Sequence, residues 1–288
     1  MSDATYGSSV QLAVGDGVRS FGWYDGRLFV QRSIKSPLFL LLNMKGEPVD
    51  SFGAFGHGEN ELMMPTLLTE AGAQSMHIYD NASKSIYNVQ GQQLSINKRL
   101  SFSYDVNDMK SAGWPCVGYT YFNRDSVKLE LFNVDTQKVC ATFNITDSKH
   151  KPDVFMLAVS WDVYAGHMVY AYMYYNKFCI SAWDAGKQQA SGTFECSLDQ
   201  AAPKKEKCCY TDVACGERSF FLLSQKNVKS SAQGGGGYSE IEEFDYEGNA
   251  LRRIRLDGLY LKMAYDHQHT LYLLSLDEDV VKCIDVQR

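Results

Sequence analysis

The segment LNMKGEPV at residues 42–49 indicates the fold, because variants of it recur along the chain. Each copy has an apolar residue, then Asn, Asp or Trp, then two further residues and often Gly. The other copies are YNVQGQQL at 87–94, FNVDTQKV at 132–139, AWDAGKQQ at 182–189, FDYEGNAL at 244–251 and a shorter IDVQR at 284–288. The Asn, Asp or Trp positions are 43, 88, 133, 183, 245 and 285, so successive copies lie 45, 45, 50, 62 and 40 residues apart. A period in the forties is typical of propeller blades.

The segments between these turns carry strand signals and little helix signal. They are short, rich in β-branched and aromatic residues, and bounded by Gly, Asn and Asp. Examples are 27–31, 76–79, 127–132, 167–173, 178–182, 220–223 and 271–274. Because no long run sustains the apolar period of a capped helix, the sequence predicts an all-β chain.

A second series of turns precedes the second strand of each unit, for example at Asp25-Gly26 and Ala165-Gly166. Two turn series per unit give about four strands, so we expect a six-bladed β-propeller of four-stranded antiparallel blades. The N-terminal strand at 9–14 should pair with the last blade, which removes two exposed edges. Residues 1–288 then form a single domain, with 1–7 loose and loop insertions at about 200–208 and 226–238.

Composition excludes several classes of protein. The chain has 28 Lys and Arg against 34 Asp and Glu, a net charge of −6, which argues against a nucleic-acid partner. With 45% hydrophobic residues the chain can bury a large core, and we expect a globular monomer. The longest apolar stretch, MVYAYMYY at 168–175, is far shorter than the roughly 20 residues of a membrane-spanning helix, so we expect no membrane span.

The eight cysteines are too sparse for a disulfide scaffold, and we expect them to be mostly free thiols. The N-terminal MSDATYGSSV shows neither the basic nor the apolar region of a secretory signal. Two interpretations follow: the chain is cytoplasmic, or a leader has been removed.

Residues 52–65, FGAFGHGENELMMP, resemble the FGxxGxGxGEFxxP segment that links blades in NHL-type repeats. The similarity is greatest to six-bladed NHL-like or TolB-like propeller proteins of Bacteroides and its relatives. It rests on Phe52, Gly53, Gly56, Gly58, Glu61, Leu62 and Pro65. The resemblance implies a six-bladed propeller in the cell envelope, as a periplasmic or surface lipoprotein, in a family whose biochemical roles are mostly unassigned.

Propellers bind ligands at the mouth of the central channel, where the innermost strands meet. The spacing places these strands near 18–23, 66–70, 104–109, 155–160, 210–214 and 259–264. The polar and aromatic candidates for a ligand site at that mouth are Arg19, Glu70, Asp108, Trp114, Asp212 and Lys262.

Two functions compete for these residues. The first is a non-enzymatic binding or scaffold propeller that recognises a peptide, protein or glycan at one end of the channel and needs no cofactor. The alternative is a Ca²⁺-dependent hydrolase, similar to six-bladed lactonases of the gluconolactonase type, with Glu70, Asp108 and Asp212 as oxygen ligands. The sequence contains no GxSxG nucleophile elbow and singles out no catalytic residue. We therefore favour the binding function.

Overall fold

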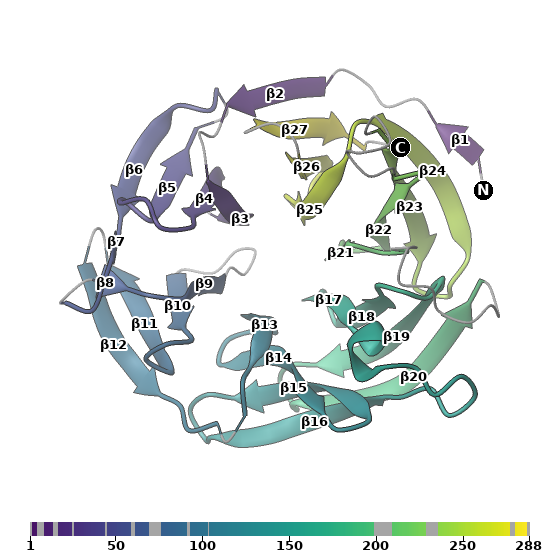
Figure 1. Cartoon of the computed structure of the whole chain (residues 1–288), viewed down its shortest axis with the longest axis horizontal. Helices are drawn as coiled ribbons and strands as arrows, with labels where there is room; N and C mark the ends of the chain where they lie inside the picture. The colour runs from purple at the N-terminus through teal and green to yellow at the C-terminus, as the bar shows by residue number, and fades with distance from the viewer. Residues whose placement is uncertain are drawn as a thin grey trace. The chain divides into compact units, whose positions relative to one another are not determined.

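The computed structural model describes residues 2–4, 9–13, 17–24, 26–43, 45–58, 61–68, 76–90, 93–102, 104–198, 209–228, 236–276 and 280–286. Six sheets, each built on four antiparallel strands, and one short 3-10 helix, η1 (Val154–Leu157), account for most of these residues. The sheets are the blades of a β-propeller, each with strands in antiparallel order (Figure 1). The predicted all-β, six-bladed fold is confirmed. No helix in these ranges is long and apolar enough to cross a membrane.

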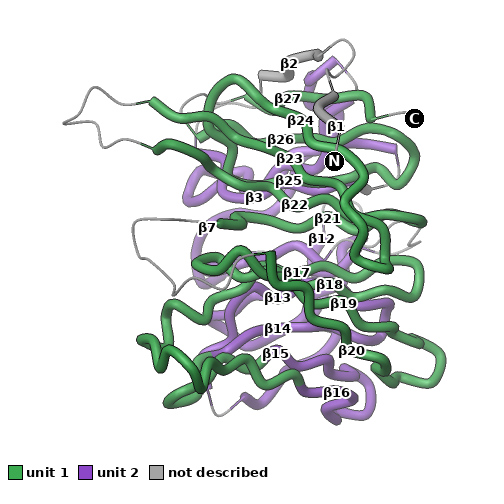
Figure 2. Tube along the Cα trace, turned by 90° about the vertical axis from the view of Figure 1, so that its right-hand side faces the viewer, with its two compact units in different colours: residues 1–11, 122–128, 143–288 green, residues 12–121, 129–142 purple. Residues whose placement is uncertain are grey.

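The chain divides into two compact units (Figure 2). Unit 2 comprises residues 12–121 and 129–142, and unit 1 comprises residues 1–11, 122–128 and 143–288.

Unit 2 holds the first two sheets and most of the third. The first sheet is β3 (Val18–Tyr24), β4 (Arg27–Arg32), β5 (Phe39–Leu42) and β6 (Pro48–Phe52). The second is β9 (Pro65–Leu68), β10 (Met76–Asp80), β11 (Ser85–Gln90) and β12 (Gln93–Arg99). The third is β13 (Asn107–Ser111), β14 (Cys116–Asn123), β15 (Ser126–Asn133) and β16 (Lys138–Ile145).

Unit 1 holds the remaining sheets. The fourth is β17 (Val159–Tyr164), β18 (His167–Tyr172), β19 (Lys177–Asp184) and β20 (Gln189–Ser197). The fifth is β21 (Asp212–Cys215), β22 (Ser219–Lys226), β23 (Tyr238–Asp245) and β24 (Ala250–Asp257). The sixth has β25 (Tyr260–Tyr265), β26 (Thr270–Ser275) and β27 (Val280–Asp285).

The N-terminal segment contributes strands to two sheets. β2 (Ser9–Ala13) lies beside β27 as the outer strand of the sixth sheet, as the sequence predicts for 9–14. β1 (Ser2–Ala4) pairs with β24 in parallel, with Ser2 opposite Arg252, and makes the fifth sheet five-stranded. Most of the predicted insertion at 200–208 and the centre of the one at 226–238 lie outside the described residues.

In three of the sheets the recurring Asn or Asp of the turn motif closes the hairpin between the third and fourth strands. The Asn43 side-chain oxygen accepts from the backbone N–H groups of Lys45 and Glu47 at 2.9 and 3.0 Å. Asn133 and Asp245 act in the same way in the third and fifth sheets, forming Asx turns. These bonds explain why the Asn or Asp recurs in the first, third and fifth sheets.

The Glu61 side chain stabilises the linker between the first and second sheets. A short parallel pair, β7 (Ala54–Phe55) and β8 (Glu61–Leu62), brackets the loop. The Glu61 carboxylate accepts the backbone N–H of Gly58 at 2.6 Å. Gly56 has φ of 154°, which other residues rarely adopt, and a Cβ there would displace that carboxylate, so the position favours glycine. Pro65 then begins β9, where the missing N–H is tolerated.

Apolar faces of successive sheets pack together within each unit. In unit 1 one cluster joins Val169 and Phe178 of the fourth sheet to Phe220 and Phe244 of the fifth. A second cluster joins the fifth sheet to the sixth. In unit 2 comparable clusters join the first sheet to the second and the second to the third. Each large buried side chain contributes about 1.5–3 kcal/mol.

Candidate functional site

The predicted channel-mouth residues of unit 2 lie on different elements. Arg19 is exposed on β3. Asp108 is half-buried on β13, with φ of 46°, within a stretch where the register to β14 shifts. The Trp114 ring stacks on His77, with centroids 3.6 Å apart, and packs against the unit's core. Glu70 lies outside the described residues.

In unit 1 the structure brings two predicted residues together. Asp212 of β21 is 3% exposed, and its carboxylate lies 4.0 Å from the Lys262 ammonium on β25. One Asp212 oxygen accepts from the Ser160 hydroxyl of β17 at 2.8 Å. The other accepts from the Met263 backbone N–H of β25, also at 2.8 Å. Asp212 therefore links the innermost strands of three consecutive sheets.

The proposed calcium ligands are not assembled by any one unit. Asp108 belongs to unit 2 and Asp212 to unit 1. Within the described ranges, no three His, Cys, Asp or Glu side chains lie close enough to hold a metal ion.

Aromatic and histidine rings gather at the turns of unit 1 that follow the first strand of each sheet. Tyr164, at the end of β17, stacks on His267 in the β25–β26 turn, with ring centroids 3.6 Å apart. The Tyr265 ring meets the same imidazole edge-on at 5.6 Å. The β21–β22 turn fits beneath them because it has Gly216, where a Cβ would come within 3.0 Å of the Tyr265 ring.

A second stacked pair continues this surface. His167, which begins β18, stacks on Tyr246 of the β23–β24 turn, with centroids 3.7 Å apart. The Tyr246 hydroxyl donates to the Gly216 carbonyl at 2.7 Å. The same turn is held by Asp162, whose carboxylate accepts the Cys215 backbone N–H at 2.7 Å. We call Tyr164, His167, Tyr246, Tyr265 and His267 the turn face; all five side chains are half-buried.

The rings of Tyr164, His167, Tyr246 and His267 are neutral near pH 7. Burial lowers the pKa of His267 to about 4 and also lowers the pKa of His167. Burial raises the pKa of Tyr164 and of Tyr246. A general acid or base needs a pKa close to the working pH, so these rings are suited to stacking and hydrogen bonding.

Two buried cysteines of unit 1 are also unsuited to act as nucleophiles. Burial raises the pKa of Cys179 and of Cys283 to about 11. Both thiols are therefore protonated at neutral pH and are unreactive.

A separate polar cluster occupies the third sheet. Glu130 of β15 is 7% exposed, and its carboxylate accepts from the hydroxyls of Tyr119, Tyr104 and Tyr121 at 2.9, 3.0 and 3.1 Å. The rings of Tyr104 and Tyr121 stack at 3.8 Å. Burial raises the pKa of Tyr119, so this phenol remains a donor that stabilises the buried charge.

Sequence reasoning missed the turn face, although two of its signals were visible. Tyr164 belongs to a segment dense in aromatic residues, and His267 belongs to the sequence Asp266-His267-Gln268-His269. In an extended strand the two imidazoles would share one face, as a Zn or Cu site needs, but the segment falls between two predicted strands, which favours a turn. The structure confirms the turn: His267 has φ of 60° and its ring stacks on Tyr164.

No family model matches the chain, and no curated protein matches its sequence. Solved structures do resemble it in fold. A member of the DUF4221 family from Bacteroides vulgatus gives a TM-score of 0.67 at 8% identity, covering 98% of this chain and 97% of that one. A candidate exported protein from Bacteroides fragilis gives 0.61 at 11% identity, with 98% and 95% covered. The WD40 domain of Neurospora crassa Pan2 gives 0.54 at 10% identity, with 94% and 75% covered. At these identities the similarity shows the propeller fold alone.

Proposed function

We propose that the protein is a non-catalytic binding propeller that recognises a peptide, protein or glycan through the turn face of unit 1. The observation that carries this proposal is the pair of His–Tyr stacks on turns of three consecutive sheets. Such rings offer flat, partly exposed surfaces with polar edges, which suit stacking on a sugar ring or on a planar peptide or aromatic group.

The chemistry of unit 1 favours binding over hydrolysis. Both carboxylate oxygens of Asp212 accept hydrogen bonds from neighbouring strands, which gives this residue a structural role. The His167 and His267 rings of the turn face are neutral, and two thiols of the unit are protonated. A rigid sheet scaffold that presents side chains on its turns is a common basis for recognition.

We further propose that the protein acts in the cell envelope. The proposal is supported by the fold similarity to the candidate exported protein of Bacteroides fragilis. It is also consistent with the NHL-like linker, in which Gly56, Gly58 and Glu61 form one compact loop.

The test screens the full chain against a glycan array and a random-peptide phage library. Any ligand selected is then measured with a turn-face variant, Tyr164→Ala with His167→Ala. The matched control is Phe155→Ala, because Phe155 is 62% exposed and lies outside the turn face.

We expect the turn-face variant to lose about tenfold or more in affinity, since each stacked ring contributes roughly 1 kcal/mol or more. The control should bind like the wild type. Equal binding by the turn-face variant, or no ligand from either library, would overturn the proposal. Hydrolysis of lactones or esters on addition of Ca²⁺ would instead establish the hydrolase.

A further inference from the structure

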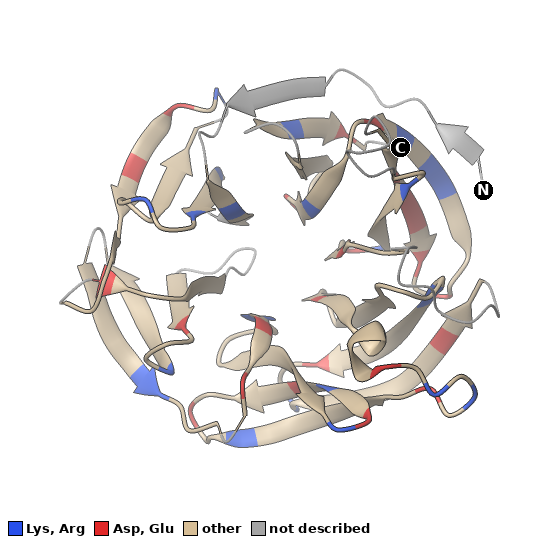
Figure 3. Ribbon diagram, in the orientation of Figure 1, with Lys and Arg blue, Asp and Glu red and all other residues tan. Residues whose placement is uncertain are grey.

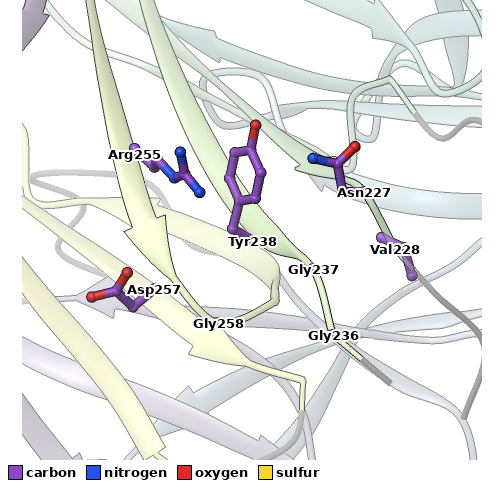
Figure 4. Close-up of a pocket in the computed structure, with 8 residues that line it drawn as sticks. All are labelled: Asn227, Val228, Gly236, Gly237, Tyr238, Arg255, Asp257 and Gly258. Atoms are coloured by element: carbon purple, nitrogen blue, oxygen red, sulfur yellow. The ribbon is translucent and has the colours of Figure 1, made fainter. Parts of the chain in front are cut away.

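A pocket of about 660 Å³ opens at the end of the fifth sheet opposite the turn face (Figure 4). It lies where β22 ends, β23 begins and β24 leads into β25. The lining residues used below are Asn227, Gly237, Tyr238, Arg255, Asp257 and Gly258. Its volume falls within the roughly 300–1,000 Å³ typical of small-molecule sites.

Strand register places three of these side chains on one face of the sheet. Glu240 of β23 lies opposite Arg255 of β24. Because side chains alternate along strands, Tyr238 and Asp257 share that face with Arg255. The Arg255 guanidinium lies over the Tyr238 ring, 3.9 Å from its centroid (Figure 4). The ring therefore holds the guanidinium in place at the pocket that Arg255 lines.

The arginines of β24 differ sharply in their partners. Basic residues on β24 face acidic residues on β23 (Figure 3). Arg252 pairs with Glu243, and Arg253 pairs with Glu242 at 3.1 Å. The Arg255 side chain is exposed, and its guanidinium forms no ion pair or hydrogen bond with the described residues. Its N–H donors are thus available to an outside acceptor.

Asn227 and Asp257 add further polar groups without partners among the described residues. Both are exposed at the rim of the pocket. A carboxylate and an amide together can accept from and donate to neighbouring hydroxyls of one ligand.

Glycines keep the wall of the pocket open. Gly237 has φ of 145°, and a Cβ there would lie within 3.1 Å of Leu259 and of the Lys226 carbonyl. Gly258 has φ of 91° and nothing within 4 Å of its Cβ position. Ordinary side chains are disfavoured at both positions, so backbone lines this side and a ligand can approach closely.

We propose that this pocket binds a uronic acid unit of an acidic glycan. The sugar carboxylate pairs with the Arg255 guanidinium, and the ring hydroxyls reach Asn227 and Asp257. Arg–carboxylate pairs are often bidentate, which orients the sugar.

The charge balance of the pocket distinguishes this ligand from other anions. Asp257 lies two residues from Arg255 on the same face, about 6–7 Å along the strand, and would repel the second charge of a phosphate. In an α-amino acid a single carbon separates ammonium from carboxylate, which is too short to span the two side chains. A uronic acid carries hydroxyls on the far side of the ring from its carboxylate. Its carboxylate can therefore pair with Arg255 while a hydroxyl reaches Asp257.

The experiment titrates the full chain with a galacturonic acid tetrasaccharide by isothermal calorimetry. The comparison ligands are its methyl ester and inorganic phosphate. The variants are Arg255→Ala and Asp257→Asn, with Arg124→Ala as the matched control because Arg124 is an exposed arginine in the β14–β15 turn. All three substitutions alter exposed side chains, and thermal melting checks that each variant is folded.

We expect saturable binding of the tetrasaccharide and a loss of about tenfold or more with Arg255→Ala, since a charge-assisted hydrogen bond is removed. The methyl ester should bind at least about tenfold more weakly for the same reason. Asp257→Asn should weaken tetrasaccharide binding less than Arg255→Ala does, and Arg124→Ala should bind the tetrasaccharide like the wild type. Absence of binding by the wild type, equal binding by Arg255→Ala, or tighter binding of phosphate would each overturn the proposal. None of these results bears on the turn face, which lies at the other end of the sheets.

Discussion

Replacing Asp212 by Ala tests whether this carboxylate is a structural link between sheets or a ligand site. The side chain is 3% exposed, and its two oxygens accept the Ser160 hydroxyl and the Met263 N–H, each at 2.8 Å. The substitution removes both acceptors and leaves a buried backbone N–H without its partner.

The magnitude follows from these two bonds. Hydrogen bonds to a charged group contribute about 1.5–3 kcal/mol each. The Ser160 hydroxyl can rotate toward another acceptor, which recovers part of its share. We expect the free energy of unfolding to fall by about 3–5 kcal/mol, and the melting temperature by roughly 6–20 °C.

Urea denaturation and thermal melting measure the effect, with and without a chelator. Asp212→Asn retains one acceptor and should cost about 1–3 kcal/mol. Lys262→Ala is the control, because its ammonium is 4.0 Å from Asp212 and its side chain is 39% exposed; it should change stability by about 1 kcal/mol or less. The reasoning is refuted if Asp212→Ala is as stable as the control variant, or if a chelator destabilises the wild type as much as the substitution does.

Three further outcomes are expected. Gly216→Ala should lower the free energy of unfolding by about 1–3 kcal/mol in urea, because the new Cβ would crowd the ring beside it; unchanged stability would contradict the packing. The pKa of His267 is about 4 when folded and about 6.5 when unfolded, so stability is full above pH 6.5 and falls by about 2–3 kcal/mol as the pH drops to 4. His267→Gln should flatten that part of the pH profile, and an unaltered slope would exclude this group as its source. Tyr119→Phe should lower the free energy of unfolding by about 1.5–3 kcal/mol, because it removes a hydrogen-bond donor to Glu130. Tyr87→Phe is the control: it alters an exposed hydroxyl and should lower the free energy of unfolding by well under 1 kcal/mol in the same denaturation assay.

The fold could be predicted because its signals are local and repeat. The Asx turn formed by Asn43 needs only the next few residues, so the same short segment recurs in successive blades. The period also located the innermost strands β21 at Asp212–Cys215 and β25 at Tyr260–Tyr265. The strand expected at 155–160 was misplaced, because η1 occupies Val154–Leu157 and β17 runs from Val159 to Tyr164. The loop at Gly56 and Glu61 is equally local, which is why its pattern is readable in sequence.

In two copies of the turn motif the Asn, Asp or Trp position does not mark the residue that closes the turn. In the fourth copy the turn is closed by Asp184, which accepts the Lys187 N–H, and not by Trp183. Trp183 is 3% exposed and belongs to the core. In the second copy Asn88 lies within β11 and accepts from Asn97 across the sheet. A one- or two-residue shift changes a turn residue into a strand residue without altering the period.

The candidate site was less predictable because it depends on contacts between sheets. Sequence placed Asp212 on an innermost strand but could not show that Ser160 and Met263 occupy its oxygens. A carboxylate that links strands and one that binds a ligand have the same local sequence. The turn face is harder still to predict, since Tyr164 and His267 are about 100 residues apart in the chain and stack between two different sheets.

The two proposed sites of unit 1 differ in chemistry and can be separated by experiment. The turn face presents neutral rings, whereas the pocket at Arg255 and Asp257 presents one charge of each sign. The eight residues of β22 run between these two ends of the fifth sheet, which places them roughly 23 Å apart. Substitutions at such a distance, with no shared partner, should add within about 0.5 kcal/mol. A variant combining Tyr164→Ala with Arg255→Ala should therefore lose both binding activities independently, whereas strong non-additivity would mean that one ligand spans both ends of the sheet.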